Sequence, residues 1–198
     1  MYKKQMVFQK ILCLLTLISG GIVFLYSLGI MTDIYDSLFK TLTIDSATHK
    51  VIRTKVPGAE IYLDMQPFNS LLLKLSIGFL IAGVLLFVTN THVRRRYYIS
   101  NFISTAIVVC YGVGFSFWAH TNLEKYKTQF LTTVDFEALK EYSQKWKSYY
   151  NDSPFWFDLH YVAFGILLAV VVLHVINIIC KVSLMKGEKA LLNGKEEA

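Results

Sequence analysis

Long apolar stretches dominate the pattern of this chain. They cover residues 11–31, 68–89, 98–120 and 155–180, and more polar segments separate them. A helix rises ~1.5 Å per residue, so ~20 apolar residues are enough to cross the ~30 Å hydrocarbon core of a bilayer. The pattern therefore predicts four transmembrane helices in a single polytopic domain that covers residues 1–198.

The first stretch could also be a secretory signal, because it follows Lys3, Lys4 and Lys10. Its apolar run is longer than the ~7–15 residues of a signal's apolar region, and no A-x-A cleavage site follows it. We interpret it as a retained span.

Residues 32–67 show the pattern of short β-strands. The β-prone runs are residues 41–44, 50–56 and 59–65. The pair Pro57-Gly58, between the last two runs, is a common turn signal. This pattern predicts a β-hairpin or a three-stranded sheet. Because two strands alone are marginal in water, the sheet needs a packing partner.

Residues 121–154 contain the pattern of an amphipathic helix. Apolar and aromatic side chains recur at helical spacing, at Phe136, Leu139, Tyr142, Trp146 and Tyr149. Asp135 is placed to cap the start of this helix, and residues 151–154 are expected to end it. We expect the aromatic face to contact the predicted sheet or a partner. The alternative is that the helix lies flat on the outer leaflet of the membrane.

The charge distribution predicts the orientation. Only 17% of the residues are charged, against ~25% in soluble domains, yet the net charge is +6. Basic residues gather at residues 1–10, at Arg94–Arg96 and in the tail 181–198. Because basic residues concentrate on the cytoplasmic side, both termini are expected in the cytoplasm, and residues 32–67 and 121–154 outside. This basic rim would face anionic lipid and requires no nucleic acid as a partner.

Ionisable residues in the spans are costly and are therefore candidates for function. Lys74 can extend its ammonium group outward to the membrane surface. It can also pair with Asp33, Asp36 or Asp158, which lie near the same outer boundary. By contrast, Cys13, Cys110 and Cys180 all lie in spans and are expected to be packing residues.

Three histidines suggest a possible cofactor site. His120 ends the third apolar stretch and His160 begins the fourth, while His174 follows 14 residues after His160. This spacing places His160 and His174 on one helical face, ~21 Å apart. It resembles the spacing in membrane b-type cytochromes, which implies haem b with histidine axial ligands. No second pair on a neighbouring helix completes such a site, and His92 is the one candidate near the inner edge.

An enzymatic alternative uses His120, Asp158 and His160 as acid–base groups that act on lipid or lipoprotein at the outer leaflet. A metal could bind the same three residues, but Asp158 and His160 point ~200° apart on a helix. Phosphate-binding glycine loops, metalloprotease motifs and nucleophile elbows do not occur in the sequence. We therefore expect no metal, no cofactor and no catalytic function as the main interpretation.

The sequence thus predicts an all-α membrane protein, a four-transmembrane-helix bundle with a small extracytoplasmic α+β cap formed by residues 32–67 and 121–154. We expect it in the cytoplasmic membrane as an accessory, interaction or sensor subunit. Its cap would contact a partner protein, a lipid or an envelope component. The expected partners are the lipid bilayer and a protein partner or a second copy of the chain.

Overall fold

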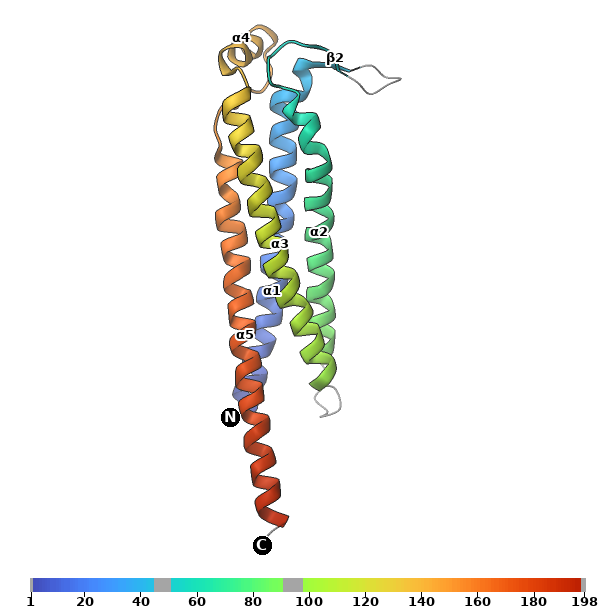
Figure 1. The fold of residues 1–198 in the computed structure, drawn as a ribbon, viewed down its shortest axis with the longest axis vertical. Helices are drawn as coiled ribbons and strands as arrows, with labels where there is room; N and C mark the ends of the chain where they lie inside the picture. Colours follow the sequence, from blue (N-terminus) through green and yellow to red (C-terminus); the bar gives the residue numbers. More distant parts are fainter. Residues whose placement is uncertain (1, 45–50, 91–97, 197–198) are drawn as a thin grey trace. The chain divides into compact units, whose positions relative to one another are not determined.

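The computed structural model describes residues 2–44, 51–90 and 98–196. Four long helices make up most of the chain (Figure 1): α1 (Tyr2–Leu38), α2 (Ile61–Asn90), α3 (Tyr98–Thr133) and α5 (Phe155–Glu196). Each is long and apolar enough to cross a membrane. The prediction of an all-α protein with four membrane-spanning helices is confirmed at this level. Arg94–Arg96 and His92, used in the sequence analysis, lie outside the described residues.

The helices extend beyond the apolar stretches that predict them. α1 continues to Leu38 and α3 continues to Thr133. In α1 the apolar side chains of Ile34 and Leu38 keep the helical spacing and are buried. A helix continues past the end of its apolar residues because its backbone hydrogen bonds are internal to the segment. The predicted ends at residues 31 and 120 therefore mark a change of composition within helices.

The chain forms two compact units, and each contains segments of the same four helices. Unit 1 consists of Met1–Ile22, Ile77–Ser116 and Gly165–Ala198. Unit 2 consists of Val23–Ser76 and Phe117–Phe164. Unit 2 also contains the short elements between the long helices, namely η1 (Phe39–Thr41), β1 (Leu42–Ile44), β2 (Val51–Thr54) and α4 (Phe136–Trp146).

Close packing in unit 1 depends on small residues. A Cβ atom added to Gly112 of α3 would meet the side chains of Val171, Leu167 and Phe79. The absence of a side chain at Gly112 thus lets α2, α3 and α5 approach closely, as small residues do in membrane helices.

Large apolar side chains also cover the outward faces of the long helices. Examples in unit 1 are Ile81, Leu85, Val113 and Ile179, all of which are exposed. Exposed apolar surface of this kind would favour aggregation in water and fits a lipid environment.

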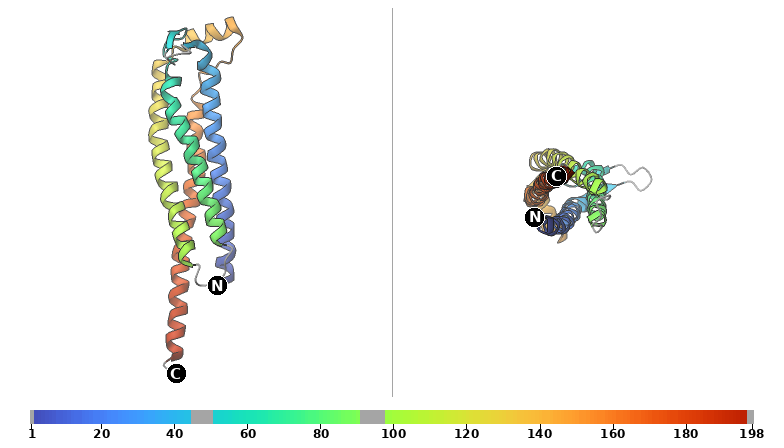
Figure 2. Two further views of the ribbon diagram at one scale, coloured as in Figure 1. Left: turned by 90° about the vertical axis from the view of Figure 1, so that its right-hand side faces the viewer. Right: turned by 90° about the horizontal axis from the view of Figure 1, so that it is seen from below.

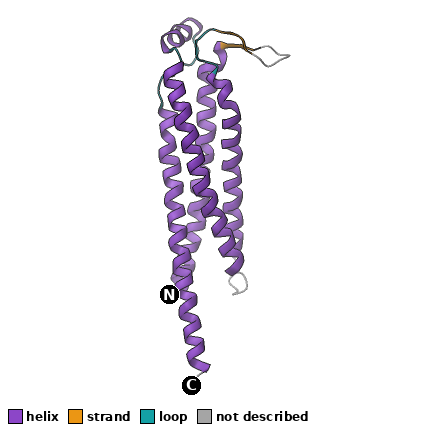
Figure 3. Ribbon diagram, in the orientation of Figure 1, coloured by secondary structure: helices purple, strands orange, loops and turns teal. Residues whose placement is uncertain are grey.

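The strands in unit 2 form one short hairpin (Figure 3). β1 pairs antiparallel with β2, with Leu42 opposite Thr54. The prediction of a strand over residues 59–65 is wrong, because this run forms a turn and the start of α2. Ile61, Tyr62 and Met65 are all buried. Their i, i+1, i+4 spacing fits one helical face and does not fit a strand, in which Ile61 and Tyr62 would point to opposite faces. The run also leads directly into an apolar span, which favours the helix.

α4 crosses the end of the helical segments of unit 2 rather than running along them (Figure 2). It begins after Asp135, whose side chain accepts a hydrogen bond from the backbone N–H of Ala138. It ends at Trp146, followed by Lys147 in the left-handed conformation with φ of 50°. The end predicted at residues 151–154 is therefore wrong. A left-handed residue stops the helix earlier, without the proline that the sequence offers at position 154.

A turn at Gly58, after the hairpin, packs against the end of α3. Gly58 has φ of +80°, and a Cβ atom there would collide with the backbone of Thr133 and Val134. Beside it, the N–H of Asp135 donates to the carbonyl of Pro57 at 3.0 Å. Only glycine suits this position, because it combines positive φ with close backbone approach.

We predict that Gly58→Ala lowers the free energy of unfolding by about 1–3 kcal/mol, because alanine adds both backbone strain and a collision. The measurement is thermal or denaturant unfolding in detergent micelles. Gly21→Ala is the matched control, since nothing lies within 4 Å of a Cβ atom at that helical position. Equal losses for the two variants would contradict the assignment.

Candidate functional site

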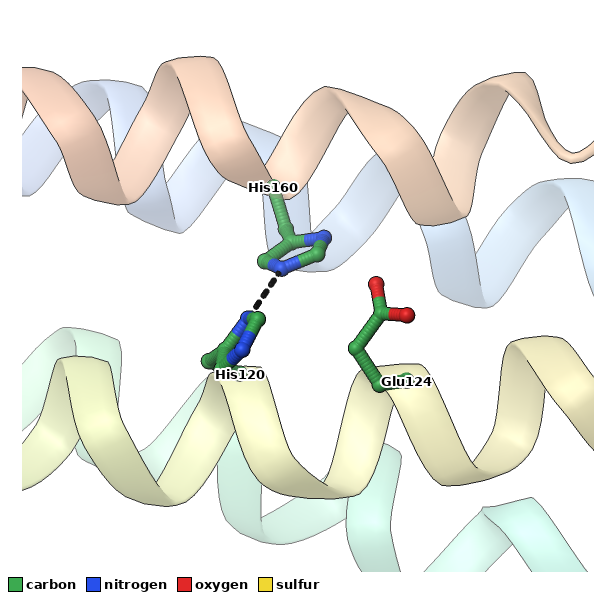
Figure 4. A group of neighbouring side chains, drawn as sticks. All are labelled: His120, Glu124 and His160. Carbon is green, nitrogen blue, oxygen red and sulfur yellow. Dashed lines mark hydrogen bonds between the residues drawn. The ribbon is translucent and has the colours of Figure 1, made fainter.

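Two predicted site histidines meet within unit 2. His120 lies on α3 and His160 on α5, and Nδ1 of His120 is 3.0 Å from Nε2 of His160 (Figure 4). His160 is only 1% exposed, whereas His120 is exposed. The pair therefore has one ring fixed in the interior and one ring at the surface.

The backbone sets the tautomer of His160. Its Nδ1 atom forms a hydrogen bond with the carbonyl oxygen of Phe157, one turn earlier on α5. A carbonyl can only accept, so Nδ1 carries the proton and the neutral ring has a lone pair on Nε2. His120 Nδ1–H then donates to this lone pair.

Glu124 completes the group, and the sequence analysis missed it. It lies one turn after His120 on α3. One of its carboxylate oxygens and one ring nitrogen from each histidine all lie within 4.8 Å of one another. The hydroxyl of Tyr161 donates to Glu124 Oε1 at 2.8 Å. The spacing His120-x-x-x-Glu124, which places both residues on one helical face, was the available signal.

Asp158 does not join the two histidines as the sequence analysis proposed. It forms an ion pair with Lys127 of α3, and the two side chains are 45% and 23% exposed. Because Asp158 and His160 are two positions apart on α5, they face different directions. Glu124, from the opposite helix, takes the place that was expected for Asp158.

Lys74 does not pair with any of its predicted partners among the described residues. Its side chain is exposed, while Asp158 pairs with Lys127. Asp33 instead accepts hydrogen bonds from the Tyr149 hydroxyl at 2.9 Å and from the Asn151 amide at 2.7 Å. The exposed position of Lys74 fits the alternative in which its ammonium extends toward the membrane surface.

A hollow lies next to Asp33 on the surface of unit 2. It has a volume of about 470 Å³ and is lined by Leu28, Gly29, Thr32, Asp33, Asp36, Tyr149 and Trp156. The pKa of Tyr149 is raised, first by burial, then by its hydrogen bond to Asp33 and by the charges of Asp33 and Asp36. The hollow therefore combines aromatic rings with negative charge.

The predicted partner-facing residues divide into two groups. Leu139 is fully buried, and Phe136 packs its ring edge-on against Phe130 within unit 2. Trp146 and Tyr149 are 60% and 50% exposed. Leu139 is therefore a packing residue, and the surface available to a partner is at Trp146 and Tyr149.

Tyr142 belongs to the packing side as well. Its hydroxyl donates to the carbonyl of Lys40, and the ammonium of Lys55 lies 5.4 Å from its ring centre. These contacts connect α4 to both sides of the hairpin. α4 is thus the packing partner that a two-stranded sheet needs.

His174 belongs to unit 1. The hydroxyl of Thr16 donates to the carbonyl of Leu12, so Nε2–H of His174 must donate to the Thr16 oxygen, 2.7 Å away. Asn177, one turn after His174, accepts a hydrogen bond from Gln5. His174 is thus engaged in a helix-to-helix contact.

The two histidine nitrogens lie closer together than opposite axial ligands of one haem would. Opposite axial ligands of one haem need their nitrogens about two metal–nitrogen bonds apart, or ~4 Å, with the porphyrin between the rings. His120 and His160 are 3.0 Å apart and in direct contact.

A buried polar network in unit 1 was also missed from the sequence. The amide of Gln9 donates to Asn101 at 2.7 Å, and the ammonium of Lys181 donates to the same oxygen. Lys181 is buried, although its position after the last apolar stretch suggested a cytoplasmic tail. Lys181 directly follows the predicted span, and the sequence does not show whether a side chain at that position points into the bundle or away from it.

Comparison of the chain with known protein families, with curated proteins and with solved structures gives no match. The function is therefore argued from the geometry.

We predict that Asp158→Asn lowers the free energy of unfolding by no more than about 1 kcal/mol, because a partly exposed ion pair contributes little. Phe130→Ala, which removes a fully buried ring, is expected to cost about 3–5 kcal/mol. Unfolding in detergent micelles measures both values. A loss at Asp158 as large as that at Phe130 would show that the carboxylate has a structural role beyond its pair with Lys127.

Proposed function

We propose that the protein is an accessory or sensor subunit of the cytoplasmic membrane. In this proposal both termini lie in the cytoplasm, and the hairpin and α4 of unit 2 form an extracytoplasmic α+β cap that contacts a partner protein. The distribution of basic residues in the sequence supports this orientation.

The observation that carries the proposal is a set of exposed aromatic side chains, one of which, Tyr149, lines the acidic hollow. Trp146, Tyr149 and Phe155 remain exposed although the neighbouring residues of α4 are packed within unit 2. Tryptophan and tyrosine contribute strongly to protein interfaces, because they bury large rings with few rotatable bonds. An aromatic surface on a supported element therefore suits recognition.

The chemistry of the hollow supports a partner with a cationic side chain. Asp33 and Asp36 supply negative charge, and Tyr149 and Trp156 supply aromatic rings. Carboxylates and aromatic faces together recognise a cationic side chain, through ion pairing and cation–π contacts. We therefore expect a lysine or arginine of the partner in this hollow. The same carboxylates would repel an anionic lipid headgroup, which favours a protein over the membrane surface.

The orientation can be tested with fusions after Ala198. We predict that a green fluorescent protein fused there is fluorescent, and that alkaline phosphatase fused there is inactive, because the first folds in the cytoplasm and the second needs an oxidising compartment. An active phosphatase fusion would reverse the proposed orientation.

The partner contact can be tested by photo-crosslinking. We predict that benzoylphenylalanine at position 146 forms a covalent protein adduct in native membranes, and that Asp36→Lys reduces its yield about tenfold or more by repelling a cationic side chain. Glu141→Lys, an exposed charge reversal on α4, is the matched control and should leave the yield unchanged. Adducts to lipid alone, or a protein adduct that is insensitive to Asp36→Lys, would contradict the proposal.

A further inference from the structure

The space between α3 and α5 in unit 2 contains three metal-ligating side chains from two helices. His120, Glu124 and His160 all point into this space (Figure 4), and one ligand atom from each lies within 4.8 Å of the others. We propose that these three residues bind a divalent transition-metal ion, with Zn²⁺ as the best-fitting ion. This site is independent of the partner surface at Trp146 and Tyr149.

The nitrogen spacing suits two neighbouring ligands of one ion. Two nitrogens bound to Zn²⁺ at ~2.0–2.1 Å and a tetrahedral angle lie about 3.3 Å apart. His120 Nδ1 and His160 Nε2 are 3.0 Å apart, so a change of a few tenths of an ångström accommodates the ion. The exposed ring of His120 can make this change without disturbing the interior.

Neighbouring groups orient two of the three ligands, His160 and Glu124. The Phe157 carbonyl fixes the proton of His160 on Nδ1, which leaves Nε2 free to bind a metal. The hydroxyl of Tyr161 holds the carboxylate of Glu124. Metal-binding histidines and carboxylates commonly have such supporting hydrogen bonds, because these fix tautomer and direction before the ion arrives.

The site is also electrically consistent with a divalent ion. Two neutral imidazoles and one carboxylate contribute a single negative charge, and Lys127 is neutralised by its pair with Asp158. When the ion binds, His120 adopts the tautomer with its proton on Nε2, so Nδ1 becomes a ligand and the ring keeps one proton.

The ligand types select the class of metal. Two imidazoles with one carboxylate occur in zinc sites that have three protein ligands, whereas Ca²⁺ and Mg²⁺ prefer oxygen ligands alone. Because His120 and Tyr161 are exposed, the fourth coordination position faces the surface. An ion with such an open position can take water or an anionic group as its further ligand.

The test uses the full-length protein, purified in detergent without a histidine tag and stripped with a chelator. Zn²⁺ binding is measured by calorimetry, and Co²⁺ is used as a spectroscopic probe of the coordination geometry. We expect one Zn²⁺ per chain and visible Co²⁺ bands typical of a four-coordinate site. His120→Ala and Glu124→Gln should each weaken Zn²⁺ binding at least about tenfold, and Tyr161→Phe about tenfold.

One variant serves as a control. His174→Ala removes a buried histidine from unit 1, so it should bind Zn²⁺ like the original protein. His120 is exposed, so its substitution tests the site even if His160→Ala fails to fold. Unchanged Zn²⁺ affinity in His120→Ala and Glu124→Gln, or no Zn²⁺ binding by the original protein, would overturn the proposal.

Discussion

The constraint on which this structure depends is that backbone polar groups find no water inside a bilayer. An unpaired N–H or carbonyl there costs several kcal/mol, so a spanning segment must satisfy its hydrogen bonds internally. α1, α2, α3 and α5 meet this demand as continuous helices, and strands occur in the described chain only between them. The specific chemistry of the protein then rests on side chains that this helical frame brings together.

Both units contain buried polar side chains that are bonded and others that are not. In unit 2, His160 is bonded through both ring nitrogens and Asp33 accepts from two donors. The Tyr26 hydroxyl and Asn69 Oδ1 in the same unit have no hydrogen-bond partner among the described residues, and neither do His174 Nδ1 and Asn177 Nδ2 in unit 1. Because an unpaired buried polar atom costs roughly 1–3 kcal/mol, these atoms lower the stability of both units.

Some features could be predicted from the sequence because they depend on local pattern. The spanning helices follow from apolar length, and the start of α4 follows from Asp135 and the spacing of the residues after it. The strand predicted over residues 59–65 is wrong because the prediction weighted the alternation of Ile61 and Met65 over the i, i+1, i+4 spacing of Ile61, Tyr62 and Met65, which fits a helical face. The sequence analysis named Asp158, which is close to His160 in sequence, and did not consider Glu124. Which carboxylate lies near the histidines depends on how α3 and α5 pack, and a single sequence does not contain that distance.

The hydrogen bonds of Asp33 have a consequence for recognition. Tyr149 and Asn151 belong to the irregular segment that joins α4 to α5, and both are anchored to a carboxylate on α1. Fixing the backbone of one residue costs about 1–2 kcal/mol in entropy, and this segment incurs that cost during folding. A ligand that docks beside it meets a surface that is already ordered, so less of its contact energy is lost to immobilising the loop. The carboxylate that stabilises the fold therefore also lowers the entropic barrier to association.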